Sequence, residues 1–142
     1  MNSSTKGPLK RSDIPVGVKL SGLWAAVMFC YAYGDLLSHW MPGTLERMSR
    51  GDLGPLGTVT PGILAGIAVC MAIPSVMVAL SLLLAPSPNR ILNVVLGLVY
   101  TAMMAATIPA GPLFYKIFSV IDAMLTLTIV WLALRWPRER QG

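Results

Sequence analysis

Four long apolar segments dominate the hydrophobic pattern of the chain, and polar, proline- or glycine-containing stretches separate them. They lie at about 16–41, 60–85, 89–108 and 113–135. About 20 apolar residues in a helix cross a hydrocarbon core of about 30 Å. Only helices or closed barrels satisfy their backbone hydrogen bonds in lipid. The pattern predicts an all-α protein, a four-transmembrane-helix bundle in one domain, 16–136, between a flexible tail at 1–15 and a basic tail at 137–142.

Proline and glycine mark the expected ends of these helices. Pro61 lies in the first turn of its segment, where proline is tolerated. Ser87 is the expected N-cap of the third segment. Pro74 lies inside the second segment and removes a backbone hydrogen bond, which predicts a kink. The breaks between segments carry Pro42-Gly43, Gly54-Pro55-Leu56-Gly57, Pro86-Ser87-Pro88 and Pro109-Ala110-Gly111-Pro112.

The longest loop, 42–59, leaves two alternatives open. Residues 44–50 would form a short interfacial helix with Leu45 and Met48 on its apolar side, and Gly51 would terminate it. Alternatively, the loop is a solvated linker.

Charge supports a membrane protein and gives an orientation. Only 12% of the residues are charged, against about a quarter in soluble domains. With both termini in the cytoplasm, eight lysines and arginines lie on the cytoplasmic side and three on the other, as the positive-inside rule requires. The first apolar segment has no small-residue cleavage site, so it is expected to be retained as a span. We expect a multi-pass protein of the cell (plasma or inner) membrane, with the lipid bilayer as its partner. No basic patch interleaved with aromatics predicts nucleic-acid binding.

Polar residues repeat at helical spacing inside the predicted spans. Because polar groups that face lipid are costly, these stripes should point into the bundle. The stripes are Tyr31, Asp35 and His39 in the first segment; Asn93, Gly97, Tyr100, Met104 and Thr107 in the third; and Tyr115, Ser119, Asp122 and Thr126 in the fourth.

The two carboxylates, Asp35 and Asp122, are the strongest functional signal. Asp35 lies about 7–8 Å from Trp40, and Asp122 lies about 13 Å from Leu113, at 1.5 Å per residue. Both therefore fall in the outer half of the membrane, which favours a shared polar pocket. The candidate pocket residues are Tyr31, Asp35, His39, Asn93, Tyr100, Tyr115, Ser119 and Asp122.

A carboxyl group removed from water favours its protonated form, and such groups couple protons to transport. This favours a small proton- or cation-coupled transporter, or a channel-like protein, with His39 and Lys116 as charge partners. The alternative is structural: Asp35 bonds Tyr31, His39 or a neighbouring helix, while Asp122 pairs with Tyr100 or Asn93.

No motif predicts an enzyme, a cofactor or a metal. Cys30 and Cys70 lack C-x-x-C spacing and are interpreted as free thiols. The nine methionines are spread along the chain and are interpreted as adaptable packing rather than a copper site. His39 alone does not make a metal site.

Gly62 and Gly66 form a small-xxx-small pair in the second segment. Together with Pro74, they are the candidate helix-packing residues of this segment. They would pack it either against another helix of the same chain or against a second copy in a homo-oligomer. A non-catalytic membrane subunit or scaffold that packs with a partner membrane protein is therefore the alternative function.

Several blocks of the sequence resemble a known family. They are Leu20-Ser21-Gly22-Leu23-Trp24, Phe29 through Asp35, Gly54-Pro55-Leu56-Gly57, Met71-Ala72-Ile73-Pro74-Ser75, Asn89-Arg90 with Leu92-Asn93, and Trp131 through Pro137. Over about 18–137 the chain is similar to an uncharacterised family of bacterial four-span membrane proteins, domain-of-unknown-function family 6326. The resemblance implies four membrane helices and carries no activity. A looser, topological similarity to DoxX-like membrane proteins would imply a quinone- or sulfur-linked redox component, a third alternative.

Overall fold

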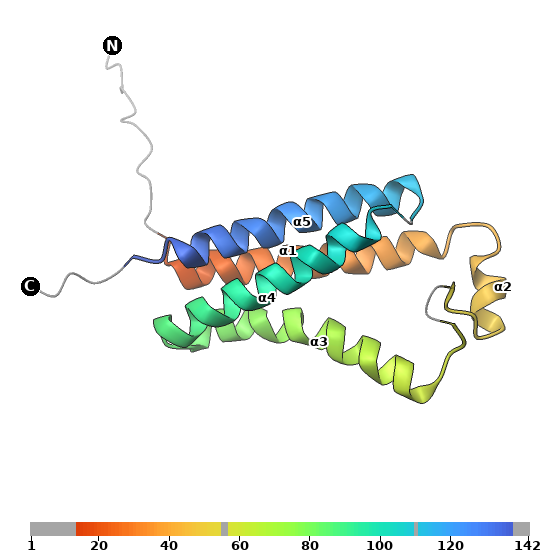
Figure 1. Cartoon of the computed structure of the whole chain (residues 1–142), viewed down its shortest axis with the longest axis horizontal. Helices are drawn as coiled ribbons and strands as arrows, with labels where there is room; N and C mark the ends of the chain where they lie inside the picture. The colour runs from red at the N-terminus through yellow and green to blue at the C-terminus, as the bar shows by residue number, and fades with distance from the viewer. Residues whose placement is uncertain (1–13, 55–56, 110, 138–142) are drawn as a thin grey trace, which may run out of the picture.

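The computed structural model describes residues 14–54, 57–109 and 111–137. The expected tails at 1–15 and 137–142, and the expected turns at 54–57 and 109–112, lie partly outside this range. The described chain has five helices: α1 Val16–Ser38, α2 Thr44–Ser49, α3 Pro61–Leu83, α4 Pro86–Thr107 and α5 Leu113–Leu134 (Figure 1). One isolated β-bridge, Asp52 to Thr58, is the only β-structure in that part of the chain.

Four of these helices, α1, α3, α4 and α5, are long and apolar enough to cross a membrane. At 1.5 Å per residue, 23 residues of α1 or α3 extend about 34 Å, which exceeds the hydrocarbon core. Their outward faces are apolar and exposed, as lipid-facing surfaces must be. The prediction of an all-α, four-span bundle is confirmed.

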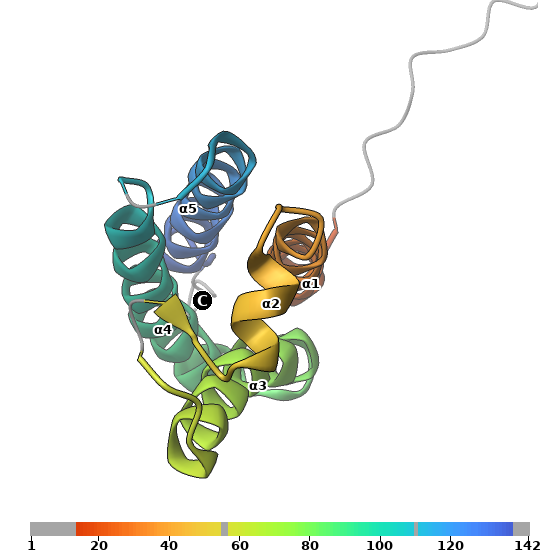
Figure 2. The ribbon, with the colours of Figure 1, turned by 90° about the vertical axis from the view of Figure 1, so that its right-hand side faces the viewer.

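The two ends of the bundle are distinct (Figure 1). One end, here the terminal end, holds the start of α1, the turn between α3 and α4, and the end of α5. The other, the α2 end, holds α2 and the connection between α4 and α5. Around the bundle axis the order is α1, α3, α4, α5, and α2 lies across the α2 end (Figure 2).

Two helix boundaries differ from the prediction. Helix α1 ends at Ser38 rather than at 41, because the amides of residues 39–41 bond to carbonyls three residues back, in tight turns. Helix α4 begins at Pro86, three residues earlier than predicted, and Ala85 rather than Ser87 is its N-cap. Two prolines fit this first turn because its amides have no helical acceptor.

The loop contains the short helix α2, as the first alternative predicts, and its position at the membrane interface stays a prediction. Helix α2 ends just before Gly51, whose φ of 71° turns the chain out of the helix and costs glycine little. There the Gly51 amide bonds the Met48 carbonyl at 2.9 Å, and the Asp52 amide bonds the Arg47 carbonyl at 2.9 Å. These bonds satisfy carbonyls of the last turn.

Helix packing is uneven around the ring. Helix α5 packs along α4 and α1, and α1 packs along α3, but α3 and α4 meet only slightly. Glycines permit two close approaches: a Cβ at Gly97 would lie 2.7 Å from Val130 Cγ2, and a Cβ at Gly17 would lie 2.5 Å from the Ser81 carbonyl oxygen. The loosely packed line between α3 and α4 is here named the α3/α4 seam.

The predicted packing pair, Gly62 and Gly66, touches no other helix. A Cβ at Gly66 would meet nothing within 4 Å, and one at Gly62 would meet only the Thr60 hydroxyl at 4.0 Å. The intrachain alternative is therefore wrong, because the Pro61 half of α3 runs away from α4 (Figure 1). The homo-oligomer alternative stays a prediction.

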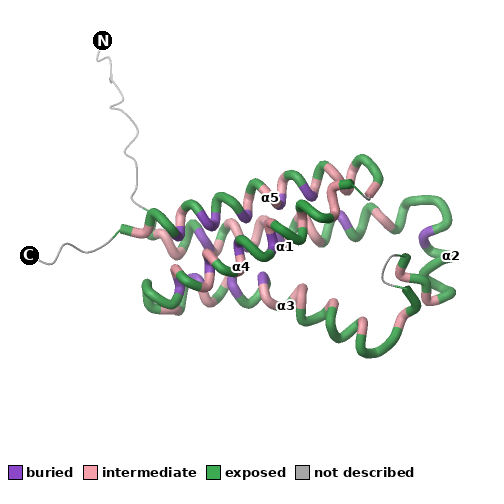
Figure 3. The backbone as a smooth tube through the Cα atoms, in the orientation of Figure 1, coloured by how far each residue is buried: buried purple, intermediate pink, exposed green. Residues whose placement is uncertain are grey.

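A chain of buried hydrogen bonds joins three helices in the terminal half. The Trp24 indole N–H donates to Asn93 Oδ1 at 2.7 Å, and Asn93 Nδ2 donates to Asn89 Oδ1 at 2.7 Å. Asn89 Nδ2 then donates to the Ser81 carbonyl at 2.8 Å. The chain lies beside fully buried apolar residues such as Leu20, and its own side chains Trp24, Asn93 and Asn89 are at most 1% exposed. Figure 3 shows the buried segments in this half of the bundle.

Pro74 explains a second interhelical bond. Proline has no N–H, so the carbonyl of Cys70 has no helical donor. The Tyr100 hydroxyl of α4 donates to that carbonyl at 2.6 Å. The Tyr100 ring also stands edge-on to Trp24, with centroids 5.9 Å apart. This bond pins the middle of α3 to α4, and α3 has no buried residue between Pro61 and Pro74.

Candidate functional site

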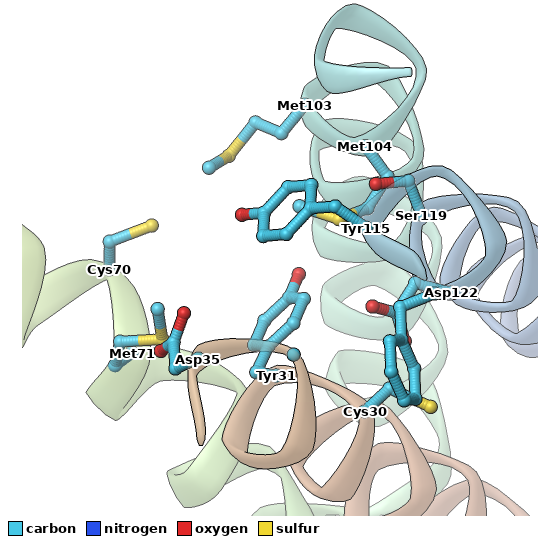
Figure 4. A pocket seen from close by; sticks show the side chains of 12 residues that line it. Cys30, Tyr31, Asp35, Cys70, Met71, Met103, Met104, Tyr115, Ser119 and Asp122 are labelled. Carbon is cyan, nitrogen blue, oxygen red and sulfur yellow. The ribbon is translucent and has the colours of Figure 1, made fainter. Parts of the chain in front are cut away.

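A cavity of about 70 Å³ lies in the α2 half of the bundle, and all four long helices line it (Figure 4). Its polar lining comes from α1 and α5, while α3 and α4 supply only sulfur-bearing side chains. The lining residues are Cys30, Tyr31, Gly34, Asp35, Cys70, Met71, Met103, Met104, Tyr115, Phe118, Ser119 and Asp122.

Helical spacing positions the polar groups. Tyr31 and Asp35 are four residues apart on α1, so they share a face. Tyr115, Ser119 and Asp122 follow four-three spacing on α5. Between these faces lies the buried Gly34, where a Cβ would come 3.9 Å from the Phe118 ring. Together α1 and α5 therefore turn two carboxyl groups and two phenols toward one space.

Asp122 is the most unusual of these residues. Its side chain is 1% exposed, and its Oδ1 atom has no hydrogen-bond partner among the described residues. The Tyr31 hydroxyl is also buried without a partner there. Buried polar atoms are nearly always hydrogen-bonded, and an unsatisfied one costs about 1–3 kcal/mol. Both residues line the cavity, so two buried polar atoms without a partner belong to residues of its wall.

Asp35 has a different environment. It is exposed and lines the side of the cavity opposite Asp122 (Figure 4), so the cavity reaches the surface at Asp35. The Asp35 backbone carbonyl accepts bonds from the Ser38 hydroxyl at 2.6 Å and from the His39 ring at 2.7 Å. His39 therefore contacts the peptide group of Asp35 at the end of α1.

The structure places five of the eight predicted pocket residues around the cavity: Tyr31, Asp35, Tyr115, Ser119 and Asp122. The other three lie elsewhere. Helix α1 ends before His39, which caps a carbonyl on the exposed surface. Asn93 belongs to the buried chain of the terminal half, and Tyr100 bonds the carbonyl freed by Pro74. Neither pairs with Asp122, so that structural alternative is not observed.

Hydroxyl groups support the α5 face of the site. Ser119 and Thr107 lie 3.1 Å apart, and Thr126 and Thr101 lie 2.7 Å apart, joining α5 to α4. The Thr126 hydroxyl also lies 2.8 Å from the Asp122 carbonyl oxygen. The two interhelical contacts join α5 to α4 on both sides of Asp122 along the chain.

Sequence reasoning did not assign the remaining lining residues to the pocket, although it placed Met104 on an inward-facing stripe. Cys30 precedes Tyr31, and Met104 shares the α4 face of Tyr100, so their positions carried a weak signal. Cys70 and Met71 carried none, because the Pro61 half of α3 has no polar residue that would reveal its inward face. Their orientation depends on the bond between Tyr100 and the Cys70 carbonyl.

Cavity size limits what the site can hold. A water molecule occupies about 30 Å³ in the liquid, whereas pockets for drug-sized ligands measure about 300–1,000 Å³. A cavity of about 70 Å³ suits a few waters, a proton or a small cation. Both cysteines are free. Among the described residues no three His, Cys, Asp or Glu side chains group as metal ligands.

Comparisons with known proteins place the chain in one family. No curated protein and no solved structure matches the chain. The model of a family of unknown function, DUF6326, matches residues 16–141, which covers all four long helices. This confirms the resemblance seen in the sequence, and the chain belongs to the DUF6326 family.

Proposed function

We propose that this protein is a small proton-coupled transporter of the cell membrane, in which Asp122 binds and releases the coupling proton. One observation carries the proposal: a carboxyl oxygen of the 1%-exposed Asp122 has no partner among the described residues, and this residue lines a cavity. Most buried side-chain polar atoms have a hydrogen-bond partner, so an unpaired carboxyl oxygen beside a cavity calls for a functional explanation.

The asymmetry of the bundle supports access from one side. The cavity reaches the surface at the exposed Asp35, whereas the terminal half is closed by the chain from Trp24 through Asn93 to Asn89. An indole N–H only donates, so Trp24 cannot accept a proton and pass it on. The described conformation therefore opens the cavity toward the α2 end and not toward the terminal end, and transport requires a second conformation in which the terminal half opens. We place the α2 end outside the cell, because only three of the 11 lysines and arginines, Arg47, Arg50 and Lys116, fall at or next to the connections of this end.

Coupling follows from competition for one carboxyl group. An ionised carboxylate is costly to bury without a partner, so Asp122 favours its proton when the cavity holds no cation. A cation that enters past Asp35 stabilises the charged form and displaces the proton. Return of the proton to Asp122 then releases the cation, and no covalent step is needed.

The test is proton flux in liposomes that contain the full-length protein and a pH-sensitive dye. We expect a cation gradient to drive proton movement in the wild type, D122N to abolish it, and D35N to weaken it. The matched control is D52N, which changes a loop carboxylate whose Oδ1 accepts from the Gly54 amide, outside the cavity. Wild-type flux that D122N leaves unchanged would refute the proposal.

A second function, a non-catalytic membrane subunit, draws support from the α3/α4 seam. Consecutive helices joined by a tight turn normally pack together, yet α3 and α4 meet only slightly, and Gly62 and Gly66 face open space. A helix of a partner protein would cover this region. A stoichiometric partner that co-purifies in mild detergent would favour the subunit function if G66L releases it and G22L does not. G22L is the matched control, because a Cβ at Gly22 would also meet nothing within 4 Å.

A further inference from the structure

Sulfur is concentrated around the cavity far beyond its frequency in the chain. Nine methionines and two cysteines make 11 sulfur-bearing residues in 142, so a random set of twelve residues would hold about one. Five of the twelve lining residues carry sulfur, both cysteines included. The sequence pattern scatters the methionines and suggested packing alone. The fold gathers three of them, because Met71 of α3 and Met103 and Met104 of α4 line the same cavity.

The sulfur groups occupy both walls of the α3/α4 seam (Figure 4). Cys70 and Met71 come from α3, and Met103 and Met104 come from α4. The α3 wall is fixed here, because the Tyr100 hydroxyl holds the Cys70 carbonyl at 2.6 Å and lies 4.0 Å from Cys70 Sγ. Methionine side chains have three rotatable bonds and adapt to a ligand.

We infer that the cavity binds a soft monovalent cation of the Cu(I) class through these sulfur atoms. The inference rests on the proposed function, since it names the cargo of the same cavity. Thioether and thiol groups select Cu(I) over Mg²⁺, Ca²⁺ or Na⁺, which prefer oxygen. Zn²⁺ is disfavoured because no three His, Cys, Asp or Glu groups converge among the described residues. The carboxyl group of Asp122 supplies the balancing negative charge.

Binding would also change the seam. The donors stand on two helices that barely touch, and one cation bound by both walls would draw them together. A ligand that binds only the folded state stabilises it in proportion to its concentration over Kd. The bound protein should therefore be more resistant to unfolding than the free protein.

The test uses Ag(I), a redox-inert ion of the same class, in chloride-free buffer, with calorimetry on the detergent-solubilised full chain. M71L/M103L/M104L removes three thioethers at nearly constant volume, a swap that cores usually tolerate. The matched control, M28L/M48L/M124L, removes three thioethers that do not line the cavity. We expect the cavity triple to bind Ag(I) at least about tenfold more weakly, since even outer-shell losses cost this much, and the control to bind like the wild type.

Two further arms keep the inference falsifiable. C70S should also weaken Ag(I) binding, and Ag(I) should raise the unfolding temperature of the wild type but not of the cavity triple. If the cavity triple variant and the control triple variant bind Ag(I) equally well, while the proton flux stays sensitive to D122N, the proposed soft-cation cargo is wrong and the proposed proton coupling stands. If Ag(I) binding depends on the cavity methionines but D122N leaves the proton flux unchanged, the soft-cation site is supported and the proton-coupled transport is refuted.

Discussion

The bond between Tyr100 and the Cys70 carbonyl can be tested by a double-mutant cycle with Pro74. Tyr100 donates to a carbonyl that has no helical donor because residue 74 is proline. Y100F therefore leaves this carbonyl without a donor. In P74A the new amide can donate to the same carbonyl, so Y100F should cost less in that background.

The magnitude follows from what the hydroxyl supplies. Interhelical hydrogen bonds in membrane proteins average about 0.6 kcal/mol and reach about 1.7 kcal/mol. Because Y100F leaves a partly buried carbonyl without a donor, we expect a loss near the upper value, about 1.5 kcal/mol, in the wild type. In P74A the loss should fall to about 0.5 kcal/mol, a coupling of about 1 kcal/mol.

The assay is reversible unfolding of all four proteins in mixed micelles, followed by circular dichroism, with free energies extrapolated to zero denaturant. Y100F/T128A provides a control pair, because Thr128 is exposed and bonds only within its own helix, at 2.7 Å from the Met124 carbonyl. In this control pair the losses of unfolding free energy caused by Y100F and by T128A should add. Equal costs of Y100F with and without P74A, within about 0.5 kcal/mol, would refute the assignment of the carbonyl as the acceptor that matters.

Three other changes probe the packing. G97A should be less stable than G66A by about 1–3 kcal/mol in an unfolding assay. Both variants gain helix propensity, but only at position 97 does the new Cβ meet a side chain of α5, at 2.7 Å. Equal stabilities would contradict this close approach. N93L should cost about 1–3 kcal/mol and shift Trp24 emission, since it removes the acceptor of the indole N–H; unchanged emission would refute the bond. G51A should cost about 1–2 kcal/mol, because alanine is strained at a φ of 71°, and it should speed hydrogen exchange at the Asp52 amide.

The four spans follow from the sequence because lipid leaves the backbone few alternatives. An apolar run of about 20 residues must satisfy its own peptide groups, so it forms a helix. Boundaries such as that of α4 at Pro86 are harder, because the prolines at 86 and 88 are equally compatible with a turn and with a first helical turn. The orientation in the membrane stays a prediction.

The polar half of the site was also visible in the sequence. Tyr31, Asp35, Tyr115, Ser119 and Asp122 fall on inward faces because lipid penalises polar groups. Asn93 and Tyr100 obey the same rule, yet neither lines the cavity. Asn93 bonds Trp24 and Asn89 in the terminal half, and Tyr100 bonds the Cys70 carbonyl at the middle of α3. Sequence spacing predicts which face of a helix points inward. It does not predict which residue of the neighbouring helix that face contacts, because this depends on how far each helix is shifted along the bundle axis.

The uneven packing of the ring has a consequence for assembly in the bilayer. Helices α4 and α5 are close in sequence and pack along their length through Gly97, so this hairpin can form as soon as both spans are inserted. Helix α3 gains little from α4 and gains most of its contacts from α1, which was inserted before it. We therefore expect assembly from two pairs, α1 with α3 and α4 with α5, whose docking through α1 and α5 is the last step and encloses Asp122.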